Sequence, residues 1–256
     1  MKIECAFIHG WAMNSAVWQP CLQQLPDWIE PRCIDLPGYG EHVAVNAVTL
    51  DETVEFVAQQ LDGPAMVVGW SLGGLVSLGL AQRYPDKVAA LYQLATNPKF
   101  VSEPHWPCAI TAGVFEQFAA SLEQDVSKTI RRFLALQVRG TESSMHTVRE
   151  LQLAIDACGL PAPWALFAGL KILADSDLVA AAESVACPMT WLLGEKDALV
   201  PVELADRLTQ MPSRPDVQIL QGAGHAPFIS HTDAFLGSLQ RAATRLKHVE
   251  STTDDQ

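Results

Sequence analysis

The stretch Met66-Val67-Val68-Gly69-Trp70-Ser71-Leu72-Gly73-Gly74-Leu75 decides the fold of this chain. An apolar, β-branched run leads into Gly-x-Ser-x-Gly, and a helix-like run follows as far as Ala81. This pattern predicts a strand, a tight turn and a helix, with the Ser71 hydroxyl lifted off the sheet at the helix N-terminus. Unpaired backbone N–H groups at such a terminus stabilise an alkoxide or an oxyanion. The alternative for the pentapeptide alone is a glycine-lined turn with an idle serine.

Two later segments supply the residue types that a nucleophilic serine needs. Asp197 follows an apolar run predicted as a strand, residues 189–193, and His225 follows a second predicted strand, residues 217–220. A serine hydroxyl is a weak nucleophile, so a histidine must accept its proton and a carboxylate must fix the imidazole tautomer. The chain order serine, acid, histidine is that of the α/β-hydrolase triad. We therefore predict that Ser71, Asp197 and His225 are the catalytic residues.

Both partners of Ser71 have competitors in the sequence. His231 lies near His225, but it begins the last predicted helix, where a capping or surface role is favoured. Asp175 and Asp177 compete with Asp197 but lie in a less ordered stretch. Asp197 is preferred because it follows a strand, and the carboxyl edge of a parallel sheet presents catalytic groups.

Attack on a carbonyl creates an oxyanion that needs two aimed N–H donors. The backbone N–H of Leu72 is one predicted donor, because Leu72 follows the nucleophile. The backbone N–H of Trp11 is the other, from the loop after the strand that ends at His9-Gly10. His9 is predicted to shape this loop rather than to transfer protons.

Composition narrows the classes of function. The 256 residues are 49% hydrophobic, enough for a full core in one domain or in a domain with a cap. No run of eighteen apolar residues occurs and no secretory signal is recognisable, so we expect no membrane span. The net charge of −12 argues against a nucleic-acid partner. The six cysteines lack CxxC or metal-site spacing, which favours a reducing cytoplasm and no metal site.

The alternation of predicted strands and helices indicates an α/β fold with a mostly parallel central sheet flanked by helices. Residues 1–108 and 181–249 are predicted to form this core. Residues 109–180 contain no convincing strand and are predicted to form an all-helical cap, inserted between strands and broken at Gly140 and at 159–163. The polar segment 250–256 is predicted to be a disordered tail.

Basic residues gather in the predicted cap. Between Lys128 and Arg149 there are five basic residues and one acid, Glu142, a local charge of +5 − 1 = +4. Such a patch on an acidic chain can steer an acidic partner. The alternative is a solvated helix face whose arginines pair with acids such as Asp125 and Glu150. The arginines concerned are Arg131, Arg132, Arg139 and Arg149.

Over its whole length the chain resembles α/β-hydrolases, and more narrowly the pimeloyl-[acyl-carrier protein] methyl ester esterases of biotin synthesis. The resemblance implies catalysis by Ser71, Asp197 and His225, with oxyanion donors at Trp11 and Leu72. It also implies that arginines of the cap receive the acidic carrier protein. The segments that carry it are His9-Gly10-Trp11, Asp35-Leu36-Pro37-Gly38-Tyr39-Gly40, Gly69–Leu75, Phe133-Leu134-Ala135-Leu136-Gln137, Gly140-Thr141-Glu142 and His225-Ala226-Pro227-Phe228-Ile229-Ser230-His231.

The chain departs from that family in two places outside the triad. It begins at the strand before His9-Gly10, where family members usually carry a preceding hairpin, so the sheet is expected to be about two strands shorter. Glu41-His42 follows Gly40, where the family usually has a basic residue and a serine. Among the cap arginines only Arg149 aligns comfortably with a family arginine, which weakens the prediction of the carrier-protein partner.

The resemblance implies hydrolysis of the methyl ester of a pimeloyl chain held on an acyl carrier protein, releasing methanol and needing no cofactor. A long apolar channel should hold the chain. Alternatives are a general short-chain carboxylesterase without a protein partner and, from another class, a ligand-binding module with little turnover. Candidate wall residues are Trp11, Trp70, Phe115, Phe133, Leu136, Trp164 and Phe167. For each aromatic residue of the predicted cap, the alternative is helix packing within the cap.

Overall fold

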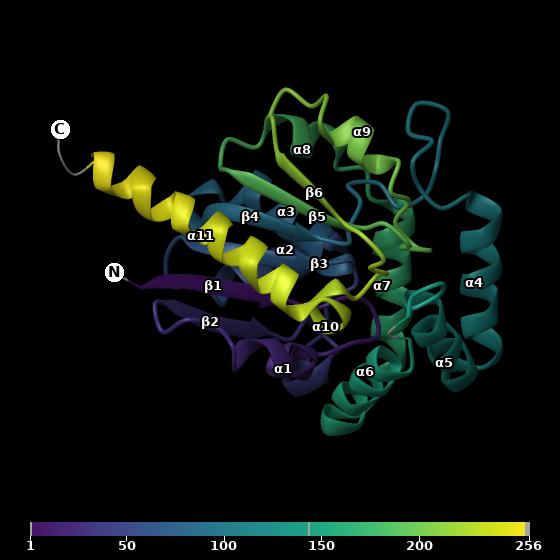
Figure 1. Ribbon diagram of the computed structural model, residues 1–256. Coiled ribbons are helices and arrows are strands. Elements are labelled where there is room, and N and C mark those ends of the chain that lie inside the picture. Colours follow the sequence, from purple (N-terminus) through teal and green to yellow (C-terminus); the bar gives the residue numbers. More distant parts are fainter. Residues whose placement is uncertain (1, 143, 254–256) are drawn as a thin grey trace.

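The computed structural model describes residues 2–142 and 144–253. Within these ranges a six-stranded sheet forms the centre of the molecule, in the order β2-β1-β3-β4-β5-β6, and every neighbouring pair is parallel (Figure 1). This confirms the predicted α/β class. The strands are β1 (Ile3–Ile8), β2 (Ile29–Ile34), β3 (Ala65–Trp70), β4 (Val88–Leu94), β5 (Met189–Gly194) and β6 (Asp216–Leu220).

Helices cover both faces of the sheet. Helix α11 (Thr232–Thr253) lies across one face, and α2 (Leu50–Gln59) and α3 (Leu72–Arg83) lie on the other (Figure 1). Every residue of β3 and β5 is therefore buried, as expected for parallel strands covered on both sides. The short elements are η1 (Ser15–Trp18), α1 (Gln19–Leu22), η2 (Gly40–His42), η3 (Pro85–Lys87), α9 (Leu204–Leu208) and α10 (Pro227–Ser230).

The chain between β4 and β5 is helical. Figure 1 shows α4 to α7 gathered at one end of the sheet, the end toward which β1 points. Gly140 (φ +78°) follows α5 and Gly159 (φ +79°) follows α6, as the sequence predicted for the breaks. The division into a core and a 109–180 cap stays a prediction. The helices are α4 (Ala112–Gln124), α5 (Val126–Gln137), α6 (Ser144–Cys158), α7 (Pro163–Asp175) and α8 (Val179–Ser184).

Two expectations concern the last helix and membranes. Helix α11 includes residues 250–253 of the segment that the sequence predicted to be disordered, and 254–256 lie outside the described residues. No helix in the described part of the chain is long and apolar enough to cross a membrane.

The turn from β3 into α3 is confined on all sides. Ser71 has φ +54° and ψ −115°, a conformation that a side-chain-bearing residue rarely adopts. A Cβ on Gly69 would strike the Gly73 carbonyl, one on Gly73 would strike the Ile8 carbonyl, and one on Gly74 would strike the Thr96 side chain. The glycines around Ser71 are therefore needed because the turn lies directly against β1 and the loop after β4.

Replacing Gly73 with alanine should destabilise the fold, because the new Cβ meets a backbone carbonyl that cannot rotate away. We expect a loss of about 1–3 kcal/mol in the free energy of unfolding, measured by urea denaturation. Gly113→Ala is the control, since nothing lies within 4 Å of a Cβ built there. An unchanged denaturation midpoint for Gly73→Ala would contradict this account.

Candidate active site

The three residues predicted to form a triad lie together at the carboxyl ends of three strands. His225 Nε2 is 2.9 Å from Ser71 Oγ, and His225 Nδ1 is 2.7 Å from Asp197 Oδ2. The side chains of His225 and Asp197 are fully buried and Ser71 is 4% exposed. Ser71 makes no capping hydrogen bond to α3, although it occupies the N-cap position. Its hydroxyl is thus directed to the imidazole.

Neighbouring groups hold the acid and the histidine in place. Asp197 Oδ1 accepts hydrogen bonds from the backbone N–H groups of Leu199 and Val200, at 2.8 and 3.0 Å, which leaves Oδ2 for the imidazole. Trp70 Nε1 donates to the His225 carbonyl at 2.8 Å. With Nδ1–H donated to Asp197, Nε2 is left to accept the serine proton. The arrangement can therefore activate a hydroxyl for attack on a carbonyl carbon.

His9 has a structural position. Its Nδ1 lies 2.8 Å from the Gly10 carbonyl, and its Nε2 accepts the Leu36 N–H at 3.0 Å. Burial lowers the pKa of His9 against the opposing effect of Asp35, so a neutral ring with its proton on Nδ1 satisfies both contacts. These bonds brace the loop that leads to Trp11. In the described residues, the N–H groups of Trp11 and Leu72 donate to no protein acceptor, which leaves both available to a ligand.

An apolar cavity of about 70 Å³ opens at Ser71. Among its walls only Ser71 carries a polar reactive group, apart from the indole of Trp11, whose Nε1 donates to the Leu166 carbonyl at 2.8 Å. The predicted wall residues Trp11, Phe115, Phe133 and Leu136 do line it. Its other walls come from Phe100, Ile110, Val114, Phe118, Leu170, Leu173 and Leu199.

Three predicted wall residues lie elsewhere. Trp70 is wrong as a wall residue: it is 1% exposed and packs behind His225, against Trp18 and Phe228. Trp164 lies against Gly38, and Phe167 is 41% exposed, so neither borders the cavity. The sequence located Phe115 but gave no signal for Phe100 or Ile110, which reach the cavity from the loop between β4 and α4.

The four arginines of the predicted cap are exposed and form no ion pair among the described residues. The predicted acidic partners are engaged otherwise: Asp125 caps α5 by accepting the Lys128 N–H, and Glu150 lies 3.9 Å from His146. We define the α5–α6 groove as the shallow apolar surface bordered by two of these arginines. Its residues are Arg131, Leu134, Ala135, Val138, Ser144, Met145, Val148, Arg149, Gln152 and Leu153.

Desolvation raises the pKa of all six cysteine thiols. All six are free thiols, and burial raises the pKa of Cys5, of Cys21 and of Cys33 to about 12. Because the thiolate is the reactive form, a raised pKa makes these thiols weaker nucleophiles at neutral pH. The described residues hold no group of three or more His, Cys, Asp or Glu that could bind a metal ion.

The model of the alpha/beta hydrolase family matches residues 6–237. The chain belongs to this family. Relatives at 36–38% identity are named pimeloyl-[acyl-carrier protein] methyl ester esterase. That of Vibrio cholerae is 36% identical, covering 94% of both chains, and that of Vibrio campbellii is 38% identical, covering 91% of both.

Solved structures show the same hydrolase fold. An esterase from Exiguobacterium antarcticum matches with a TM-score of 0.81 at 19% identity, over 96% of this chain and 92% of that one. A hydrolase from Oleispira antarctica matches with a TM-score of 0.83 at 15% identity, over 94% and 90%. At these identities the likeness establishes the fold alone.

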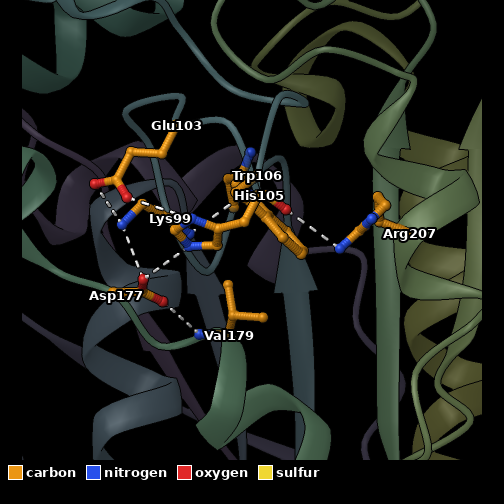
Figure 2. Close-up of polar contacts among 8 residues, drawn as sticks. Lys99, Glu103, His105, Trp106, Asp177, Val179 and Arg207 are labelled. Carbon is orange, nitrogen blue, oxygen red and sulfur yellow. Dashed lines mark hydrogen bonds and ion pairs between the residues drawn. The ribbon is translucent and has the colours of Figure 1, made fainter.

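A charged cluster connects the loop after β4 with the segment between α7 and α8. Lys99 Nζ lies 2.9 Å from Glu103 Oε1 and 2.8 Å from Asp177 Oδ2 (Figure 2). His105 lies 3.5 Å from Glu103 and 3.7 Å from Asp177. Lys99, Glu103 and His105 belong to the loop before α4, and Asp177 lies between α7 and α8. The cluster therefore fixes the loop that carries Phe100 to the cavity.

The pKa of the Asp177 carboxyl is lowered. Partial burial raises it, but the hydrogen bonds from Lys99 and from the Val179 N–H, with the Lys99 charge, lower it by more. A carboxyl whose pKa is lower when folded stabilises the fold above its unfolded pKa of about 4, and this contribution is lost as the pH falls through the lower folded value.

Asp177→Asn should therefore unfold at a lower temperature than wild type at pH 7, and the difference should shrink steadily below about pH 4. Thermal unfolding followed from pH 7 to pH 3 measures it. Asp156→Asn is the control, because that carboxylate bonds only Gln152 among the described residues. A difference for Asp177→Asn that did not change with pH would show that the charge contributes nothing.

Proposed function

We propose that this hydrolase is a serine carboxylesterase that cleaves the methyl ester of pimeloyl-acyl-carrier protein in biotin synthesis, within the cytoplasm. The observation that carries the proposal is the hydroxyl–imidazole–carboxylate chain at the mouth of an apolar cavity, in a protein whose named relatives are such esterases. The same geometry disfavours a ligand-binding module, because binding alone requires no aligned Ser71, His225 and Asp197.

In the proposed reaction Ser71 Oγ attacks the ester carbonyl while His225 Nε2 takes the hydroxyl proton. The N–H groups of Trp11 and Leu72 stabilise the oxyanion, and Asp197 stabilises the imidazolium. His225 then returns the proton to the departing methanol. Water, activated by the same imidazole, hydrolyses the acyl-enzyme and frees the carboxylate. The groups named here supply nucleophile, base and oxyanion donors, so no cofactor is invoked.

The cavity suits the acyl part of this substrate. Its aliphatic and aromatic walls bury methylene groups, each of which contributes about 0.8 kcal/mol when removed from water. Trp11 packs edge to face against Phe118 and Phe133, whose rings are tilted by 51° to each other; the centroids of the three rings lie 4.9–5.9 Å apart and form one wall. An unbranched chain therefore fits better than a charged or strongly polar acyl group.

The α5–α6 groove is the proposed docking surface for the carrier protein. Met145 is 86% exposed and Leu153 50% exposed, and Arg131 and Arg149 border them. Apolar residues flanked by unpaired positive charge fit an acidic amphipathic helix, the charges steering it and the apolar floor holding it. Arg132 and Arg139 lie outside the groove and can add only to the longer-range field.

Ser71→Ala should abolish esterase activity, because no other group can take the role of the nucleophile. On p-nitrophenyl esters from acetate to octanoate we expect kcat/KM to fall by about 10³-fold or more. The control, Ser184→Ala on α8, removes a hydroxyl that bonds only backbone carbonyls and should keep full activity. A folded wild-type protein inactive on every chain length, and unlabelled by a fluorophosphonate, would overturn the proposal.

The α5–α6 groove should be needed only for hydrolysis of the carrier-bound substrate. Neutralising Arg131 and Arg149 together as glutamines should raise KM for the carrier-bound methyl ester about tenfold or more, and leave p-nitrophenyl acetate turnover unchanged. Arg214→Gln with Arg241→Gln is the control, an equal change of charge on exposed residues outside the groove. Equal kinetics for both double variants would favour a general short-chain carboxylesterase.

A further inference from the structure

The histidine of the triad is held partly by the cap. The imidazole contacts Ser71 and Asp197, but the backbone N–H of His225 donates to the carbonyl of Gln137, at 2.9 Å. Gln137 is the last residue of α5. The residue expected to move protons is thus bonded, through its backbone, to a helix that lies between β4 and β5 in the chain.

The turn after α5 and the loop that carries His225 are in close contact. A Cβ on Gly224 would lie 2.5 Å from the Gln137 carbonyl oxygen and 3.0 Å from Thr141 Cγ2. Thr141 is itself fixed, because its N–H and hydroxyl both donate to the Val138 carbonyl, at 3.1 and 2.9 Å. The turn after α5 therefore lies directly on the loop that carries His225, with glycine as the only residue that leaves the carbonyl room.

The side chain of Gln137 adds a second observation. It is 1% exposed, and neither its Oε1 nor its Nε2 has a hydrogen-bond partner among the described residues. A buried amide without a partner costs stability, by the desolvation of both polar groups.

Helix α5 also reaches the cavity and the surface. Phe133 and Leu136 line the cavity, and Arg131 and Leu134 line the α5–α6 groove. A shift of this helix along its axis would therefore change the cavity wall and the position of the Gln137 carbonyl at once.

We propose that Gln137 is a positioning residue, which sets the place of His225 through its backbone carbonyl at the end of α5. The inference rests on the proposed function, because it concerns the same triad. Displacing the Gln137 carbonyl should misalign Nε2 with the Ser71 hydroxyl and slow acyl transfer. Binding of a small ester should be little affected by a displacement confined to the turn after α5, because Phe133 and Leu136, which line the cavity, precede that turn.

Two glycines of the cap provide a matched test. Gly140, in the turn that presents Gln137, has φ +78°, and Gly159, between α6 and α7, has φ +79°; a Cβ at either would meet nothing within 4 Å. Alanine at each therefore introduces the same backbone strain. We expect Gly140→Ala to lower kcat for p-nitrophenyl butyrate about tenfold with KM within about twofold, and Gly159→Ala to leave both unchanged at a similar loss in Tm.

A second pair of variants changes the contact with the Gln137 carbonyl from the loop that carries His225. Gly224→Ala should lower kcat about 10- to 100-fold, because its Cβ pushes the Gln137 carbonyl away from His225. Adding Thr141→Ser removes the other contacting atom, Cγ2, and keeps the hydroxyl. If the carbonyl is what matters, this second change restores nothing; full recovery would assign the effect to Thr141 and overturn the inference.

The outcomes separate the two proposals. A wild-type protein that turns over, with Gly140→Ala and Gly159→Ala equally active, overturns the positioning role and leaves the esterase intact. A folded wild-type protein that neither turns over esters nor reacts with a fluorophosphonate overturns the proposed function itself. Parallel losses in kcat and in the rate of fluorophosphonate labelling for Gly140→Ala and Gly224→Ala, at wild-type KM, support the role of Gln137.

Discussion

The rest of the site depends on one constraint, the left-handed backbone of Ser71 between β3 and α3. That conformation is kept because the turn is enclosed by the Ile8 carbonyl on one side and by Thr96 on the other. The Ser71 N–H donates to the Leu94 carbonyl at 3.0 Å, and Thr96 Oγ1 donates to the Ser71 carbonyl at 2.7 Å. The neighbouring strands therefore supply the stability that offsets the backbone strain, and the hydroxyl is left free.

What the sequence predicted was local to the ends of strands. The strand–turn–helix around Ser71, and the positions of Asp197 and His225 just after strands, follow from short patterns whose geometry the parallel sheet imposes. The strands predicted at 189–193 and 217–220 agree with β5 and β6 to within one residue at each end. These features were predictable because a few adjacent residues determine each one.

What the sequence missed depends on packing between distant segments. Trp70 precedes Ser71 in sequence, but its ring packs toward Trp18 and Phe228, and nothing local reveals which face of the strand borders the cavity. The exposure of Met145 follows from how α5 and α6 meet. The role inferred for Gln137 arises from a contact across 88 positions of sequence, 225 − 137, through a backbone carbonyl that any residue would possess.

The apolar lining of the cavity has a consequence for product release. A neutral ester loses little when it leaves water for a chamber of aliphatic and aromatic side chains, but its hydrolysis creates a carboxylate in the same place. Away from the N–H donors and the imidazole at Ser71, an anion is costly in such surroundings, and among the described residues no cationic side chain borders this cavity. Hydrolysis thus converts a ligand that the cavity binds well into one that it binds less well. The charge formed in the reaction therefore favours product release.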